Sequence, residues 1–146
     1  MEKLILKQTT LNQALEQLKT VINDYEKNNM PLEFAHGKEY LREAMMQRFE
    51  YSCELFWRFI KAYLDFAHGA VPAESGARSI IRAACKIGIL SESETDIIME
   101  MIEDRNKSSH MYLESVALQI AKHIPKYAEL MQKITSRIIL KVSSAR

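Results

Sequence analysis

Apolar residues recur along most of this chain at steps of three, four and seven positions, the spacing of one face of an α-helix. Five stretches carry this spacing: about 4–25, 38–67, 77–86, 92–106 and 116–142. Short connectors separate them, and no stretch alternates apolar and polar residues as a strand does. The sequence therefore predicts an all-α protein, a five-helix, mainly antiparallel up-and-down bundle.

Local signals mark several helix ends. Gly88 is well placed as the left-handed residue that follows the third helix. Ser91 and Glu94 have the spacing of a capping box, with Ser91 as N-cap of the fourth helix. Pro125 lies inside the last pattern and cannot donate a backbone hydrogen bond, so we expect a kink or a break between Lys122 and Lys126.

The second helix has an unusually wide apolar face. One line of apolar residues comprises Leu41, Met45, Phe49, Cys53, Phe56, Ile60 and Leu64. Trp57, Phe59 and Tyr63 widen it beyond the stripe of a simple surface helix. Such a helix needs more than one neighbour, so it lies at the bundle centre or in a subunit interface. We expect a homodimer.

Length and composition narrow the class of protein. The 146 residues have the size of one domain, spanning 1–146, and 47% of them are apolar. The net charge of +1 argues against a broad basic surface, so any contact with RNA must be local. We expect no signal peptide and no membrane span. Cys53 and Cys85 lack CxxC spacing, which favours reduced core thiols in a cytoplasmic protein.

Motifs of several enzyme classes are missing from the sequence. It has no Gly-rich phosphate loop, no cluster with metal-ligand spacing and no GxSxG. We therefore expect neither a metal nor a cofactor.

One segment, 103–112, departs from the helical pattern and gathers polar chemistry. On an unbroken helix Arg105 and His110 would lie about 140° apart, so they converge only if the helix ends between them. Asn106, Ser108 and Ser109 favour helix ends and can donate supporting hydrogen bonds. The alternative is an ordinary helix end, with Arg105 and His110 complementing the helix dipole.

The residue types in this segment suit phosphate chemistry. Histidine is the residue type that most often acts as general base or acid, and His110 can take either role. Arg105 carries a permanent planar charge that grips phosphate oxygens in pairs. Asp104 can orient either residue, but an exposed helix-face carboxylate is the simpler expectation. Tyr112 offers a phenol beside the same cleft.

Charged residues outside the segment receive a structural interpretation. We expect His36, His68 and His123 to be solvated, since they lie at connectors or near Pro125. Arg137 belongs to a mildly basic C-terminal end.

The arrangement Arg105-x4-His110-x-Tyr112 resembles the R-x4-H-x-Y motif of the HEPN superfamily, in its HepT branch. This branch is also described as the substrate-binding subunit of a nucleotidyltransferase. Flanking segments resemble the branch as well: 41–51, 55–57, 79–84, 88–90 and 101–106. The motif core alone is weakly specific, but together with Tyr112 and these segments it is strong.

The resemblance implies a cytoplasmic, homodimeric toxin that cleaves RNA without a metal and is restrained by an MNT-type nucleotidyltransferase. It assigns catalysis to Arg105 and His110. It also implies that the partner transfers AMP to Tyr112. The other interpretation of the same branch is a noncatalytic subunit that presents a substrate to the nucleotidyltransferase.

Overall fold

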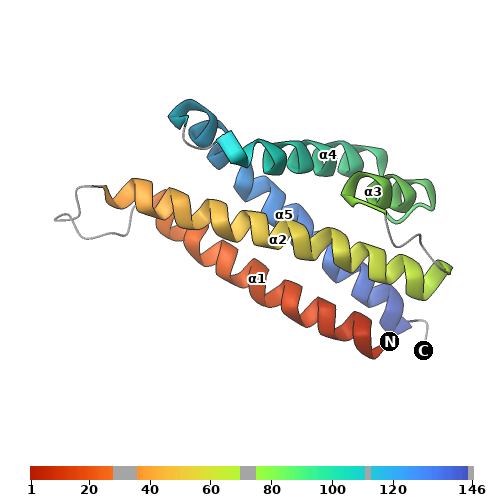
Figure 1. The fold of residues 1–146 in the computed structure, drawn as a ribbon. Coiled ribbons are helices and arrows are strands. Elements are labelled where there is room, and N and C mark those ends of the chain that lie inside the picture. The colour runs from red at the N-terminus through yellow and green to blue at the C-terminus, as the bar shows by residue number, and fades with distance from the viewer. Residues whose placement is uncertain (28–35, 70–74, 111–112, 145–146) are drawn as a thin grey trace.

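The computed structural model describes residues 1–27, 36–69, 75–110 and 113–144, and these residues form five α-helices and no strand (Figure 1). The helices are α1 (Glu2–Lys27), α2 (Gly37–His68), α3 (Ala77–Lys86), α4 (Glu92–Lys107) and α5 (Glu114–Ser144). A 3₁₀ turn, η1 (Ser108–His110), follows α4 directly. The predicted all-α bundle is confirmed, and each helix begins and ends within a few residues of its predicted bounds.

The second helix is the centre of the bundle. Helices α1 and α2 run antiparallel and pack along their length, α4 lies on the other side of α2, and α5 crosses behind it (Figure 1). Helix α2 contacts all four other helices. Its wide apolar face is therefore covered within one chain and does not by itself require a second copy. The homodimer stays a prediction.

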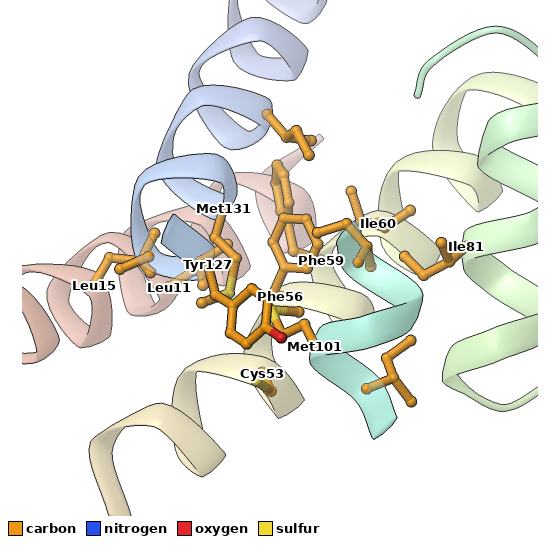
Figure 2. Close-up of a cluster of buried hydrophobic side chains, with 14 of the residues drawn as sticks. Leu11, Leu15, Cys53, Phe56, Phe59, Ile60, Ile81, Met101, Tyr127 and Met131 are labelled. Carbon is orange, nitrogen blue, oxygen red and sulfur yellow. The ribbon is translucent and has the colours of Figure 1, made fainter. Parts of the chain in front are cut away.

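The core is continuous through all five helices. Figure 2 shows side chains from each of them meeting around the aromatic rings of α2. The contributors include Leu11 and Leu15 of α1, Phe56 and Phe59 of α2, Ile81 of α3, Met101 of α4, and Tyr127 and Met131 of α5. All of these side chains are essentially inaccessible to solvent. A chain of this size buries enough apolar surface to fold without disulfides or metals.

The turn between α3 and α4 confirms the predicted caps. Gly88 has φ +83°, its N–H donates to Cys85, and the N–H of Ile89 donates to Ala84, the pattern of a Schellman motif. Ser91 Oγ accepts from the Glu94 N–H at 3.1 Å, and Glu94 Oε1 accepts from the Ser91 N–H at 2.9 Å. These bonds satisfy backbone groups that a helix end leaves unpaired.

Arg137 corrects one expectation, because it is more than part of a basic end. Its guanidinium donates to both carboxylate oxygens of Glu94 at 2.9 Å. It also donates to the carbonyl oxygen of Ile89 at 2.7 Å. The residue therefore ties α5 to the start of α4.

Of the kink or break expected between Lys122 and Lys126, the break does not occur. Helix α5 continues as one helix through Pro125. Proline removes one backbone donor, so the carbonyl of Ala121 loses its usual partner. Ala121, Ile124 and Ala128 on either side are buried, and this packing keeps the helix in place across the missing bond.

The two cysteines differ in environment. Both are free, but Cys53 is buried whereas Cys85 is only half-buried, so the expectation of two core thiols is right for one of them. Among the described residues, no helix is both long and apolar enough to cross a membrane.

Candidate functional site

The end of α4 carries the residues that the sequence singled out. The α-helix ends at Lys107, and η1 continues from Ser108 to His110. The predicted helix end between Arg105 and His110 is therefore confirmed. The change from an α-helix to a tighter 3₁₀ turn alters the angle between successive side chains, as convergence of the two residues requires.

Arg105 is held at this helix end by a serine. Ser108 is buried, its Oγ donates to the Arg105 carbonyl at 2.6 Å, and Arg105 Nη1 donates to the same Oγ at 3.3 Å. The nearest carboxylate, Glu50 on α2, lies 4.0 Å from Nη1. Both side chains of this pair are about one-third exposed, so solvent weakens the attraction.

The charge of Arg105 is thus only loosely compensated. Among the described residues, its Nε is buried and has no hydrogen-bond acceptor. A guanidinium with one serine bond, a distant carboxylate and an unused donor has capacity to bind an anion.

A cavity of about 120 Å³ lies beside Arg105, between α2, α3 and α4. Cys53, Trp57, Met101, Arg105 and Asn106 are among its lining residues. Burial raises the pKa of the Cys53 thiol well above its usual range and outweighs the lowering effect of the nearby Arg105 charge. The buried thiol therefore keeps its proton, and a protonated thiol is a poor nucleophile.

The remaining motif residues lie on the exposed side of the turn. Asn106, Ser109 and His110 are exposed, and Ser109 Oγ donates to the Asn106 carbonyl at 3.3 Å. The structure thus brings Arg105 and Ser108 into contact and places His110 on the following turn. Tyr112 lies outside the described residues, so its position beside His110 stays a prediction.

Asp104 is not the exposed helix-face carboxylate that we expected. It is 6% exposed, and its Oδ2 accepts hydrogen bonds from the Tyr127 hydroxyl at 2.6 Å and from His123 Nδ1 at 2.8 Å. Burial, together with the bond to Asp104, raises the pKa of the Tyr127 hydroxyl above its usual range, so this hydroxyl keeps its proton. Asp104 therefore orients His123 and Tyr127 of α5.

His123 is likewise not a solvated histidine. Its side chain is about one-third exposed and also lies 3.7 Å from Glu100, which accepts from Lys126 at 3.1 Å. One ligand atom each from Glu100, Asp104 and His123 lies within 4.8 Å of the others, a spacing that suits a divalent cation. Tyr127 and the Lys126 ammonium already satisfy the two carboxylates. We interpret the group as a hydrogen-bond network.

Sequence reasoning missed Glu50 and the network around Asp104. Glu50 lies 55 residues before Arg105, and His123 and Tyr127 follow Asp104 by 19 and 23 residues. A single sequence contains no local signal for contacts between helices so far apart. Apolar positions on both sides of Tyr127 were the only hint that α5 turns this face inward.

The comparisons with known proteins agree on family and fold. The family model described as "Nucleotidyltransferase substrate binding protein like" matches residues 6–139. A solved structure from Thermus thermophilus, that of the protein ttk003001694, shares 30% identity, covers 88% of this chain and 98% of its own, and has a TM-score of 0.74.

A second solved structure supports the fold alone. A chain of a toxin-antitoxin complex with AMP-PNP is 15% identical, covers 92% of this chain and 96% of its own, and has a TM-score of 0.67. No curated protein matches the chain significantly.

Proposed function

Because the chain belongs to the nucleotidyltransferase substrate binding protein like family, in the HepT branch of the HEPN superfamily, we propose that it is a toxin ribonuclease restrained by a partner nucleotidyltransferase. The observation that carries the proposal is Arg105. Its guanidinium is fixed at the end of α4 by Ser108, is about one-third exposed and is only weakly paired with Glu50. The motif histidine follows on the next turn.

The reaction that fits these residues is transphosphorylation. The RNA 2′-oxygen forms a bond to the neighbouring phosphorus, and the bond from phosphorus to the 5′-oxygen of the next nucleotide breaks. The products are a 2′,3′-cyclic phosphate and a 5′-hydroxyl. One proton leaves the 2′-hydroxyl and one is delivered to the departing 5′-oxygen, so charge and atoms balance without a metal.

Each motif residue has a role in this reaction. His110 accepts the first proton and supplies the second, the role that histidine most often takes in general acid–base catalysis. Arg105 holds the phosphate oxygens and stabilises the negative charge that grows in the transition state. Ser108 holds the guanidinium in place. When RNA binds, the phosphate replaces Glu50 as the ion-pair partner of Arg105. Asn106 and Ser109 line the exposed side and donate supporting hydrogen bonds.

The direct test is cleavage of total RNA in the presence of EDTA. We expect the wild type to cleave, and His110→Ala and Arg105→Lys to lose about 100-fold or more of the rate. His36→Ala is the matched control, because it removes an exposed histidine far from the motif in sequence. Equal cleavage by the wild type and His110→Ala, or cleavage by neither, would contradict the ribonuclease proposal.

A second measurement tests the mechanism itself. An oligonucleotide whose cleaved nucleotide carries a 2′-deoxyribose lacks the nucleophile and should resist cleavage at that position. Its all-ribose counterpart should give a cyclic phosphate end. Cleavage of the deoxy substrate at the same bond would refute the 2′-hydroxyl mechanism.

The proposed restraint is AMP on Tyr112. The partner would direct the Tyr112 oxygen to the α-phosphorus of ATP, with release of pyrophosphate and the phenol proton. The attached phosphodiester then lies two residues from His110 in sequence, and Arg105 pairs with it instead of with RNA. The modification blocks the site because the attached phosphate pairs with the Arg105 guanidinium, which can then no longer bind RNA.

Mass spectrometry after incubation with the partner, ATP and Mg²⁺ tests this switch. We expect one or more AMP units on the Tyr112 peptide of the wild type and none in Tyr112→Phe. Tyr51→Phe, which removes an exposed tyrosine, is the control and should keep the adduct. An adduct that persists in Tyr112→Phe, or modified protein that cleaves at the full rate, would overturn the switch.

The second candidate function is a noncatalytic subunit that holds a substrate for the nucleotidyltransferase. The description of the matching family and the net charge of only +1 favour it. It predicts partner binding without RNA cleavage by any variant.

In both cases we propose a cytoplasmic homodimer, and light scattering at micromolar concentration should give twice the mass of 16.9 kDa. A clean monomer mass would reject the dimer.

A further inference from the structure

A groove separate from the Arg105 cavity lies between the first half of α1 and the second half of α2. Its volume is about 540 Å³, in the range of sites that bind small molecules or single nucleotides. Lys3 and Lys7 line it from α1. Trp57, Arg58, Lys61 and Phe66 line it from α2. None of these residues belongs to the motif that carries the proposed reaction.

The groove concentrates positive charge in a chain that is nearly neutral overall. Lys3, Lys7, Arg58 and Lys61 contribute four cationic side chains against one carboxylate, that of Asp65, an excess of three where the whole chain has +1. Among the described residues, Lys3 and Lys7 have no ion-pair partner. They lie four residues apart on one helix face, where like charges repel. A bound polyanion would relieve this repulsion.

Aromatic rings accompany these cations. The Trp57 indole is half-buried, donates from Nε1 to Glu54 at 3.1 Å and lies 5.4 Å from the Arg58 guanidinium carbon. Phe66 is 46% exposed. Arg58 also pairs with Glu54 at 3.1 Å, which reduces its own charge. Cations along a groove with rings on its wall are the features that bind single-stranded nucleic acid, since phosphates pair with the cations and bases stack on the rings.

The groove and the cavity beside Arg105 share one lining residue on α2. Trp57 lines both this groove and the cavity that contains Arg105 and Asn106. From Glu50, the ion partner of Arg105, to Lys61 is eleven residues of α2, about 16 Å along the helix axis. That distance accommodates a short run of nucleotides beside the reacting phosphate.

We propose that the groove between α1 and α2 binds the single-stranded RNA next to the cleaved phosphate, with Lys3, Lys7 and Lys61 holding backbone phosphates and Trp57 stacking on a base. This inference rests on the proposed ribonuclease function for its substrate. Such a groove would let a chain of low net charge bind RNA, because the required cations are gathered in one place.

Fluorescence anisotropy with a labelled single-stranded RNA of about 12 nucleotides tests the groove. All proteins carry His110→Ala and EDTA is present, so binding is measured without cleavage. We expect Lys3→Gln with Lys7→Gln to weaken binding about tenfold at low salt. The logarithm of the association constant falls as the logarithm of the salt concentration rises. The magnitude of this slope should decrease by about 0.7 for each phosphate that the variant no longer neutralises. Trp57→Leu should weaken binding about fivefold or more, and Trp57→Phe less.

The matched control is Lys122→Gln with Lys133→Gln, which removes two exposed lysines from α5, outside the groove. Circular dichroism checks that each variant is folded. Equal loss of affinity in the control pair, or no detectable RNA binding by the parent protein, would overturn the proposal. A groove variant that no longer binds the partner nucleotidyltransferase but still binds RNA would also overturn the proposal, because the groove would then be a protein interface.

The two proposals can fail separately. Groove variants that bind RNA as tightly as the parent protein, and that keep the wild-type kcat/KM when His110 is present, would show that the groove proposal is wrong. The ribonuclease proposal would then still stand. If the wild type cleaves nothing but RNA binding depends on Lys3, Lys7 and Trp57, the ribonuclease is wrong and the groove stands.

Discussion

Replacing Glu94 by Gln removes the charge at the point where α3, α4 and α5 are joined. The Glu94 carboxylate accepts from the Ser91 N–H and takes two bonds from Arg137, all at 2.9 Å. Its side chain is only 12% exposed, whereas that of Arg137 is 36% exposed. A glutamine keeps one acceptor oxygen but turns an NH₂ group toward the guanidinium, so at least one of the two Arg137 bonds is lost.

The pKa of Glu94 gives the magnitude. Hydrogen bonding to Arg137 is the largest cause that lowers this pKa from 4.5 to about 2, and the Ser91 backbone bond adds to it while burial opposes it. At 1.36 kcal/mol per pKa unit, the shift corresponds to about 3 kcal/mol of stability. Because Arg137 is partly exposed to solvent, we expect Glu94→Gln to reduce the free energy of unfolding by about 2 kcal/mol at pH 7.

The pH dependence has a defined sign. The folded-state pKa is lower than the unfolded one, so the stabilisation is present above the ordinary value of 4.5 and is lost as the pH falls toward 2. Most of the difference between wild type and Glu94→Gln should remain at pH 5, and about half of it should be gone at pH 3.

Urea unfolding followed by circular dichroism measures this difference at pH 7, 5 and 3. Glu92→Gln is the matched control, because it removes the same charge from the same first turn without touching Arg137, and it should cost about 0.5 kcal/mol. Equal losses in the two variants at pH 7, or a Glu94→Gln deficit that does not change between pH 7 and pH 3, would refute the reasoning.

Two further substitutions and one chemical modification test other parts of the structure. Tyr127→Phe leaves the buried Asp104 carboxylate with one hydrogen bond fewer and should destabilise the protein by about 1.5–3 kcal/mol in urea unfolding; an unchanged midpoint would contradict the buried network. Gly88→Ala has space for the methyl group but must keep φ at +83°, so a loss of about 1 kcal/mol is expected by the same assay, and a gain in stability would argue against the left-handed turn. A thiol reagent at pH 8 should modify Cys85 in the native protein and Cys53 only after unfolding, and rapid reaction of both would disprove the burial that raises the Cys53 pKa.

The helices could be predicted because their signals are local. Apolar spacing, the Ser91 and Glu94 pair and the glycine after α3 each act within a few residues, and the structure confirms all of them. The end of α4 was predictable for the same reason, since asparagine and serine favour such ends. The break considered at Pro125 does not occur, because the buried residues around the proline keep the helix continuous.

The contacts of charged residues could not be predicted in the same way. Asp104 and Arg137 were assigned to the surface because most such residues are exposed. Each instead has a partner on another helix, 19 to 43 residues away in the chain. Only the packing of α4 against α5 brings these groups together, and one sequence contains no signal for the register of that packing.

The buried network matters for the candidate site because Asp104 and Arg105 are neighbours on one helix. Successive side chains on a helix point about 100° apart, so Asp104 faces α5 while Arg105 faces the cavity beside α2. Moving the last turn of α4 would leave a buried carboxylate without the bonds from Tyr127 and His123, which is costly. The turn that presents Arg105 is therefore fixed from its opposite face, while the guanidinium has only a serine and a carboxylate at 4.0 Å to hold it. A cation with unused binding capacity on a fixed helix end is preorganised for an anion, and this extends the candidate site beyond its motif to Asp104, His123 and Tyr127.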